Sequence, residues 1–88
     1  MKLLVLYRPL SEHATAVEDY VNNFRRDYPD KELELMDVDS IDGSNKAQLY
    51  DVVRYPAFLA LDSAGSLLNM WSGSDLPLVG EVAGYLNS

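Results

Sequence analysis

Cysteine does not occur once in the 88 residues of this chain. A protein without thiols forms no disulfide, exchanges none and has no thiolate nucleophile. Zinc and iron–sulfur sites that use cysteine ligands are excluded for the same reason. With neither a disulfide nor an obvious metal site, a domain of this size must be stabilised by the packing of its core.

Basic residues are also scarce, because seven Lys and Arg stand against fourteen Asp and Glu and give a formal net charge of -7. Broad binding to nucleic acid requires basic patches that displace counterions, so we expect none here. An anionic membrane surface would repel a protein of this charge in the same way. The expected partners therefore include neither nucleic acid nor membrane.

Long apolar runs, repeats and flexible linkers are missing as well. The apolar start of the chain is interrupted by Arg8 and Pro9, which makes it too short for the core of a signal peptide or for a membrane span. We therefore expect a cytoplasmic protein. Without a repeat or a Pro/Gly/Ser-rich linker, the sequence predicts a single domain over residues 1–88.

The first half of the chain alternates between strand and helix patterns. Residues 2–8 are apolar without alternation, which predicts a central strand buried on both faces. Helical spacing of apolar residues predicts a helix that begins after Ser11, the expected N-cap, and ends before Pro29. Residues 32–38 are predicted to form a second strand, parallel to the first.

The second half predicts a short helix, a hairpin and a final helix. In order, we expect a polar turn over residues 39–44, a helix over 45–52, strands over 57–61 and 66–71 joined by the turn 62–65, and a helix after Gly73 with Pro77 in its first turn. The resulting order, β-α-β-α-β-β-α, predicts an α/β fold with a four-stranded mixed sheet flanked by helices.

Three segments stand in the order and at the spacing of a known family. They are residues 6–14 (LYRPLSEHA), residues 53–59 (VRYPAFL) and residues 62–65 (DSAG). They are similar, in turn, to the strand-to-helix turn that carries a Cys-x-x-Cys motif, to the cis-proline segment, and to the hairpin turn before the last strand of the thioredoxin-like family, which includes thioredoxins and glutaredoxins. The resemblance spans nearly the whole chain and implies a minimal thioredoxin-like fold with a cis-proline at Pro56.

The chain departs from this family where its chemistry belongs. Ser11 and Ala14 stand at the positions of the two cysteines. A serine hydroxyl is not ionised near neutral pH and forms no reversible disulfide, so thiol–disulfide oxidoreductase activity is not expected. The resemblance then implies a redox-inactive domain that acts by binding, without a catalytic residue.

The resemblance places a binding cleft between the N-terminus of the first helix and the cis-proline loop. Its expected residues are Arg8, Leu10, Ser11, Arg54, Tyr55, Pro56, Gly73, Ser74 and Asp75. Arg8 and Arg54 would form a locally positive pocket there. The expected ligand is a protein segment, added as an extended strand, or the acidic end of a small peptide. In the plainer alternative the arginines are solvated or paired, and Ser74 and Asp75 cap the last helix.

Glutathione is a further ligand that the resemblance implies. Arg8 falls where many glutaredoxins place a basic residue near a glutathione carboxylate, and residues 73–75 resemble their segment for the γ-glutamyl end. Some glutathione transferases use a serine placed like Ser11 to hydrogen-bond a thiolate, although 88 residues leave no room for their second domain. A structural remnant without cleft function is also open, as is a homo-oligomer formed through an exposed sheet edge.

The remaining chemistry-bearing residues match no pattern of a site. His13, the single histidine, lies two positions from Ser11 and hence on another face of a helix. Asp37, Asp39 and Asp42 lack the spacing of a calcium loop. We therefore expect no metal, and no cofactor other than the glutathione alternative.

Overall fold

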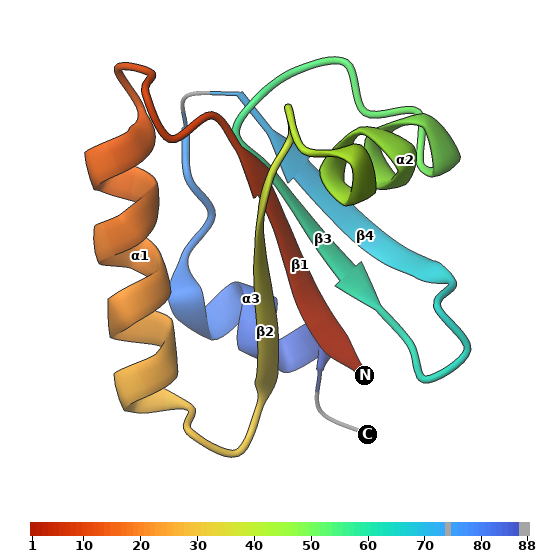
Figure 1. Ribbon diagram of the computed structural model, residues 1–88. Coiled ribbons are helices and arrows are strands. Elements are labelled where there is room, and N and C mark those ends of the chain that lie inside the picture. Colours follow the sequence, from red (N-terminus) through yellow and green to blue (C-terminus); the bar gives the residue numbers. More distant parts are fainter. Residues whose placement is uncertain (74, 87–88) are drawn as a thin grey trace.

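The computed structural model describes residues 1–73 and 75–86. Its elements are β1 (Lys2–Tyr7), α1 (Ala14–Asp27), β2 (Glu32–Asp37), α2 (Ile41–Leu49), β3 (Ala57–Leu61), β4 (Leu67–Ser72) and α3 (Val79–Tyr85). The strands form one sheet in the order β2-β1-β3-β4, in which β1 and β2 are parallel and the other pairs are antiparallel. The predicted α/β fold and its element order are confirmed (Figure 1).

Strand β1 is buried on both faces, as its unbroken apolar sequence predicts. Leu3 and Val5 point to one face and pack with α1 and α3, whereas Leu4 and Leu6 point to the other face and pack with α2. All four side chains are fully buried. Burial of one such side chain contributes about 1.5–3 kcal/mol to the free energy of unfolding. Strand β1 therefore stabilises both cores.

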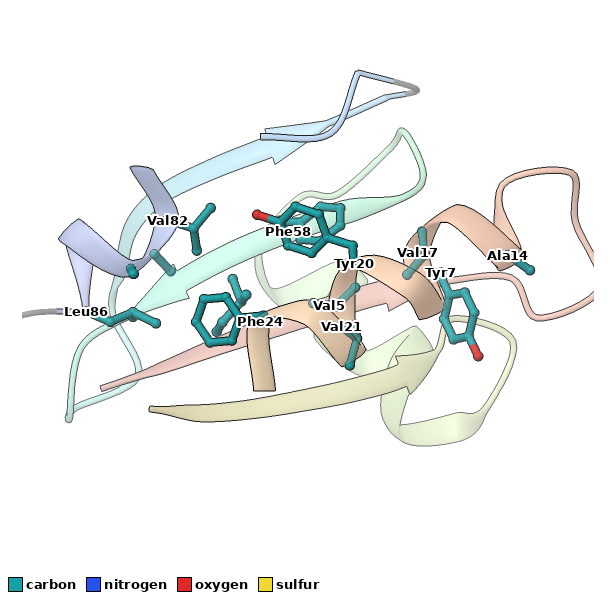
Figure 2. Close-up of a cluster of buried hydrophobic side chains, with 13 residues drawn as sticks. Val5, Tyr7, Ala14, Val17, Tyr20, Val21, Phe24, Phe58, Val82 and Leu86 are labelled. Atoms are coloured by element: carbon teal, nitrogen blue, oxygen red, sulfur yellow. The ribbon is translucent and has the colours of Figure 1, made fainter. Parts of the chain in front are cut away.

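Helix α1 covers one face of the sheet with the stripe that its helical periodicity predicts. Val17, Val21 and Phe24 of this helix are buried against the sheet, together with Val82 and Leu86 from the C-terminal segment (Figure 2). Tyr20 lies in the same cluster, with its ring centroid 4.7 Å from that of Phe58 in an edge-to-face arrangement. This packing anchors the helix whose N-terminal end borders the predicted cleft.

The Tyr20 hydroxyl is buried in this cluster with no hydrogen-bond partner among residues 1–73 and 75–86. Burial, and then the charge of Glu81, raises the pKa of Tyr20, so the hydroxyl keeps its proton at neutral pH. An unpaired buried donor costs about 1–3 kcal/mol. The Tyr20 hydroxyl therefore lowers the stability of the fold, whereas the ring contributes to the packing of the core.

Replacing Tyr20 with phenylalanine is expected to raise the free energy of unfolding by about 1 kcal/mol, because the ring stays and the unpaired hydroxyl goes. Urea denaturation measures the difference. The matched control is Tyr50→Phe, which removes a hydroxyl that donates to the Gly65 carbonyl at 2.6 Å and should lower the same quantity. A loss of stability in the Tyr20 variant would show that the hydroxyl has a partner.

The start of α1 differs from the prediction, because Ser11 is not its N-cap. The helix begins at Ala14, and His13 occupies the N-cap position without a side-chain cap. The Ser11 backbone N–H and hydroxyl both donate to the Arg8 carbonyl, at 3.1 and 2.6 Å. Residues 11–13 therefore form a turn that precedes the helix.

Helix α2 begins four residues before the predicted start at Asn45. Ser40 is its N-cap, with the Oγ atom accepting from the Gly43 backbone N–H at 3.0 Å. Gly43 is therefore a helical residue, and of the predicted polar turn over residues 39–44 only residues 39 and 40 lie outside the helix. The physical reason is close packing, because an added Cβ at Gly43 would overlap the Asp37 carbonyl oxygen.

The remaining boundaries are shifted by smaller amounts. Arg8, Val38 and Ser66 lie just outside the strands in which they were expected. Pro77 precedes α3, which begins at Val79, instead of standing in its first turn. Strand β3 has the predicted bounds, since the cis-proline segment and the hairpin turn mark both of its ends.

Candidate functional site

Three connections meet at one end of the sheet, the end at which the family resemblance places the cleft (Figure 1). They join β1 to α1, α2 to β3, and β4 to α3. Glu12 of the first connection lines the same hollow as Pro56 of the second and Leu76 of the third. Gly73 joins the second and third directly, because its N–H donates to the Pro56 carbonyl at 3.0 Å.

Three open hollows between described residues lie at this end, and we call them together the cleft. The α2 hollow, between Arg8, Tyr55 and helix α2, has a volume of about 390 Å³. The α1 hollow, about 350 Å³, lies between Tyr55, Pro56 and the start of α1. The loop hollow, about 200 Å³, is lined by Arg8, Leu10 and Ser11, among others. Arg8 and Tyr55 each line two hollows and so stand at their junction.

Arg8 is held by two neighbours at this junction. The carbon atom at the centre of its guanidinium lies 5.3 Å from the centroid of the Tyr55 ring. Its Nε atom lies 3.7 Å from Asp39 Oδ1, and more than half of each side chain is exposed. An exposed ion pair of this kind is worth about 0–1 kcal/mol, so a ligand can exchange its partners at little cost.

The turn between β1 and α1 presents an apolar side chain beside Arg8. Leu10 is fully exposed, at 103% of its reference area. The turn itself is held by backbone and side-chain bonds, because Arg8 N–H donates to His13 Nε2 at 3.3 Å and Ser11 donates to the Arg8 carbonyl. The hydroxyl hydrogen of Ser11 is thus already engaged within the turn.

The connection before β3 carries unpaired backbone groups. The Tyr55–Pro56 peptide bond is cis. The Tyr55 hydroxyl donates to the Val52 carbonyl at 3.3 Å, which holds the half-buried ring against the loop. The backbone N–H and C=O of Tyr55 have no hydrogen-bond partner within residues 1–73 and 75–86. Buried or half-buried backbone groups are usually paired, so this segment is a place where another chain can pair.

Tyr7, the last residue of β1, borders this end of the sheet. Its hydroxyl donates to Glu18 Oε2 at 3.1 Å. Burial, and secondly this hydrogen bond, raise the pKa of the Tyr7 hydroxyl, which therefore stays neutral at pH 7. Tyr7 therefore adds no charge at this end of the sheet.

The structure brings together five of the nine predicted cleft residues, namely Arg8, Leu10, Ser11, Tyr55 and Pro56. Arg54 is exposed and lines none of the three hollows, so Arg8 lines them without the second arginine of the predicted pair. Gly73, with φ of 97°, supports the Pro56 loop without lining a hollow, and Asp75 is exposed outside them. Ser74 lies outside the described residues.

Glu12, Asp51, Val53 and Leu76 are among the residues that line the cleft and that sequence reasoning missed. Val53 stood inside the segment that resembles the cis-proline region, which was the one available signal. Glu12 and Asp51 read as ordinary exposed charges because nothing in a linear sequence shows that they approach Tyr55.

Neither a metal-binding cluster nor a membrane-spanning helix occurs in the part of the chain that the structure describes. No cluster of three or more His, Cys, Asp or Glu is placed to hold a metal ion. None of the helices over residues 1–73 and 75–86 has the length and apolar character needed to cross a bilayer.

Comparison with solved structures identifies the fold. Thioredoxin 1 from Thermosipho africanus matches with a TM-score of 0.71 at 16% identity, over 98% of this chain and 90% of that one. Thioredoxin O2 from Arabidopsis thaliana, in its oxidized state, matches with a TM-score of 0.73 at 15% identity, over 97% and 70%. The chain has a thioredoxin-like fold.

Another thioredoxin agrees with this assignment. The germline-specific thioredoxin Deadhead from Drosophila melanogaster is 22% identical, with a TM-score of 0.66 over 97% of this chain and 78% of its own. No protein-family model matches the sequence, and no curated protein does. The thioredoxin-like fold is therefore shown by its geometry, and the Cys-x-x-Cys motif is absent from the chain.

Proposed function

We propose that this thioredoxin-like domain is a redox-inactive binding module that takes an extended segment of another protein in its cleft. The observation that carries the proposal is the unpaired backbone of Tyr55, which lies between two open hollows. An extended segment beside Tyr55 would donate to its carbonyl and accept from its N–H, as in strand addition. Side chains that alternate along that segment would reach the hollows on either side.

The shape of the cleft favours a segment of protein over an enclosed small molecule. Pockets for small molecules have volumes of about 300–1,000 Å³ and cover most of the ligand. The hollows here, at about 390, 350 and 200 Å³, are individually at or below the lower end of that range and open to solvent. A peptide that crosses Tyr55 would use several of them at once.

The composition of the cleft rim supports the same function. Leu10 and Val53 are apolar, and 103% and 85% of their reference areas are exposed. They flank Arg8 and Tyr55, residue types that are enriched at the energetic centres of interfaces. Burying these four side chains against a partner would remove apolar surface from water without a change in the fold.

Replacing Leu10 and Val53 together with serine is expected to lower partner capture about tenfold or more, because each loses an apolar contact of about 1 kcal/mol or more. Capture from the source cell, quantified against the unmodified chain, measures this loss. Both side chains are exposed, so the free energy of unfolding should stay within about 0.5 kcal/mol.

The matched control replaces Ile41 and Leu49 with serine. These side chains of α2 are also largely exposed, at 82% and 67%, but line none of the three hollows. Equal capture by both double variants would refute the proposed cleft. Glutathione is the competing ligand. Saturable shifts of the amide signals around Ser11 and Pro56 in a glutathione titration would identify this tripeptide, and not a protein segment, as the ligand. We expect no such shifts, since the Ser11 hydroxyl donates to the Arg8 carbonyl.

A further inference from the structure

Among the charged residues that line the cleft, carboxylates outnumber arginine and lysine. Glu12 lines the α1 hollow, Asp37 lines the loop hollow, and Asp39 and Asp51 line the α2 hollow. Among the described lining residues, Arg8 is the one lysine or arginine, and its charge is already paired with Asp39. The cleft therefore carries a local excess of negative charge at neutral pH, within a chain whose formal net charge is -7.

Asp51 stands where the stability of the fold favours another residue. It follows helix α2 with φ of 55°, the left-handed conformation in which glycine is most common after a helix. Its carboxylate also lies next to the C-terminal end of α2, where the helix carbonyls carry partial negative charge and favour a cation. Two local effects thus oppose this carboxylate, and it lines the α2 hollow all the same.

We propose that the cleft is specific for segments that combine lysine or arginine side chains with an apolar anchor. This inference rests on the proposed function and names its partner class. The cation of the segment pairs with Asp39 and Asp51 in the α2 hollow, and the anchor contacts Leu10 or Val53. The charge of the whole chain adds a long-range attraction that speeds association with a basic partner.

The same charges disfavour the other occupants of this face. A second copy of the chain would bring the same carboxylates against those of the first, and like charges in apposition are repelled. An acidic peptide end, which the two arginines were expected to attract, meets one paired arginine and three further carboxylates. A basic segment is the occupant whose charge complements the cleft.

A selection from a library of random linear peptides, displayed on phage and panned against the whole chain, tests this inference. We expect the enriched peptides to carry Lys or Arg close to an aliphatic or aromatic residue. Synthetic copies should bind the variant with both Asp39→Asn and Asp51→Asn about three- to tenfold more weakly, the effect of removing two exposed charges. Added NaCl should weaken binding further, because salt screens exposed charges.

The matched control carries Asp19→Asn and Asp30→Asn, which change the net charge by the same amount. Both residues are exposed and line none of the three hollows, and Asp30 lies in the α1–β2 connection at the opposite end of the sheet from the cleft (Figure 1). The affinity of this variant should stay within twofold of the unmodified chain. An equal loss in both variants would mean that net charge, not the cleft, attracts the peptide.

The outcomes separate this inference from the proposed function. Peptides that need Leu10 and Val53 but are acidic or uncharged would overturn the charge preference and leave the binding function standing. Peptides that bind the Leu10→Ser, Val53→Ser variant unchanged would overturn the cleft itself, as would a library with no enrichment. An Asp51→Gly variant that melts higher and binds the basic peptides more weakly would support the inference, whereas unchanged binding would contradict a role for this carboxylate.

Discussion

Replacing Phe58 with alanine is expected to lower the free energy of unfolding by about 4 kcal/mol. Phe58 lies on β3, an interior strand, and its side chain is 1% exposed. Its ring meets Tyr20 edge-to-face, and its partners in the adjacent strands are Val5 and Trp71. Truncation removes the buried ring and leaves a cavity between β3, α1 and α3 that a close-packed core fills incompletely.

Urea denaturation with linear extrapolation measures this loss. Because small domains are stable by about 5–15 kcal/mol, the variant should unfold at a much lower urea concentration or be partly unfolded in buffer. The control is Leu10→Ala, which truncates a fully exposed side chain and should change stability by less than about 0.5 kcal/mol. A cost near 1 kcal/mol for the Phe58 variant would contradict the central place of this ring in the core.

Replacing Gly43 with alanine is expected to lower the free energy of unfolding by about 3 kcal/mol, although helix propensity alone favours alanine by about 1 kcal/mol. Gly43 is buried in the first turn of α2. A Cβ atom there would overlap the carbonyl oxygen of Asp37 and crowd the Ser40 hydroxyl that caps the helix. Since the obstacle is backbone, α2 must move away from the end of β2.

The matched control is Gly84→Ala in α3. Its added Cβ meets no heavy atom within 4 Å, so propensity acts alone and stability should rise by about 0.5–1 kcal/mol. If urea denaturation shows a loss of stability for Gly43→Ala and a gain for Gly84→Ala, the contact with the end of β2 accounts for the loss. Movement of α2 would also displace Ser44 and Gln48, which line the α2 hollow, so the Gly43 variant should bind peptides more weakly.

The elements that local patterns define were predicted correctly. The unbroken apolar run of β1 implies burial on two faces, and Leu3 and Leu4, adjacent in sequence, are fully buried in different cores. Strand β3 was predicted with its bounds because the proline segment and the turn over residues 62–65 stand at its ends. In both cases the structure depends on residues that are close together in the sequence, so a local sequence pattern predicts it.

The helix starts were predicted incorrectly because tertiary or competing contacts decide them. Ser11 has the chemistry of an N-cap, but the backbone bonds from Ser11 N–H to the Arg8 carbonyl and from Ala14 N–H to the Ser11 carbonyl form a turn there, and the helix begins only at Ala14. Gly43 has the chemistry of a turn residue, but the close approach of α2 to Asp37 requires a glycine inside the helix. A sequence pattern indicates the conformational propensity of each residue, but it does not show which atoms of other segments will contact that residue in the fold.

The sequence by itself determined that this chain has no thiol chemistry, since that conclusion follows from the absence of one residue type. It also determined the order of the elements, through hydrophobic periodicity and turn residues. Only the tertiary structure decided the charge of the cleft. Glu12, Asp39 and Asp51 belong to segments far apart in the chain, and they line one cleft because the sheet brings the ends of its strands together. Electrostatic interaction depends on distance through space, which the fold sets.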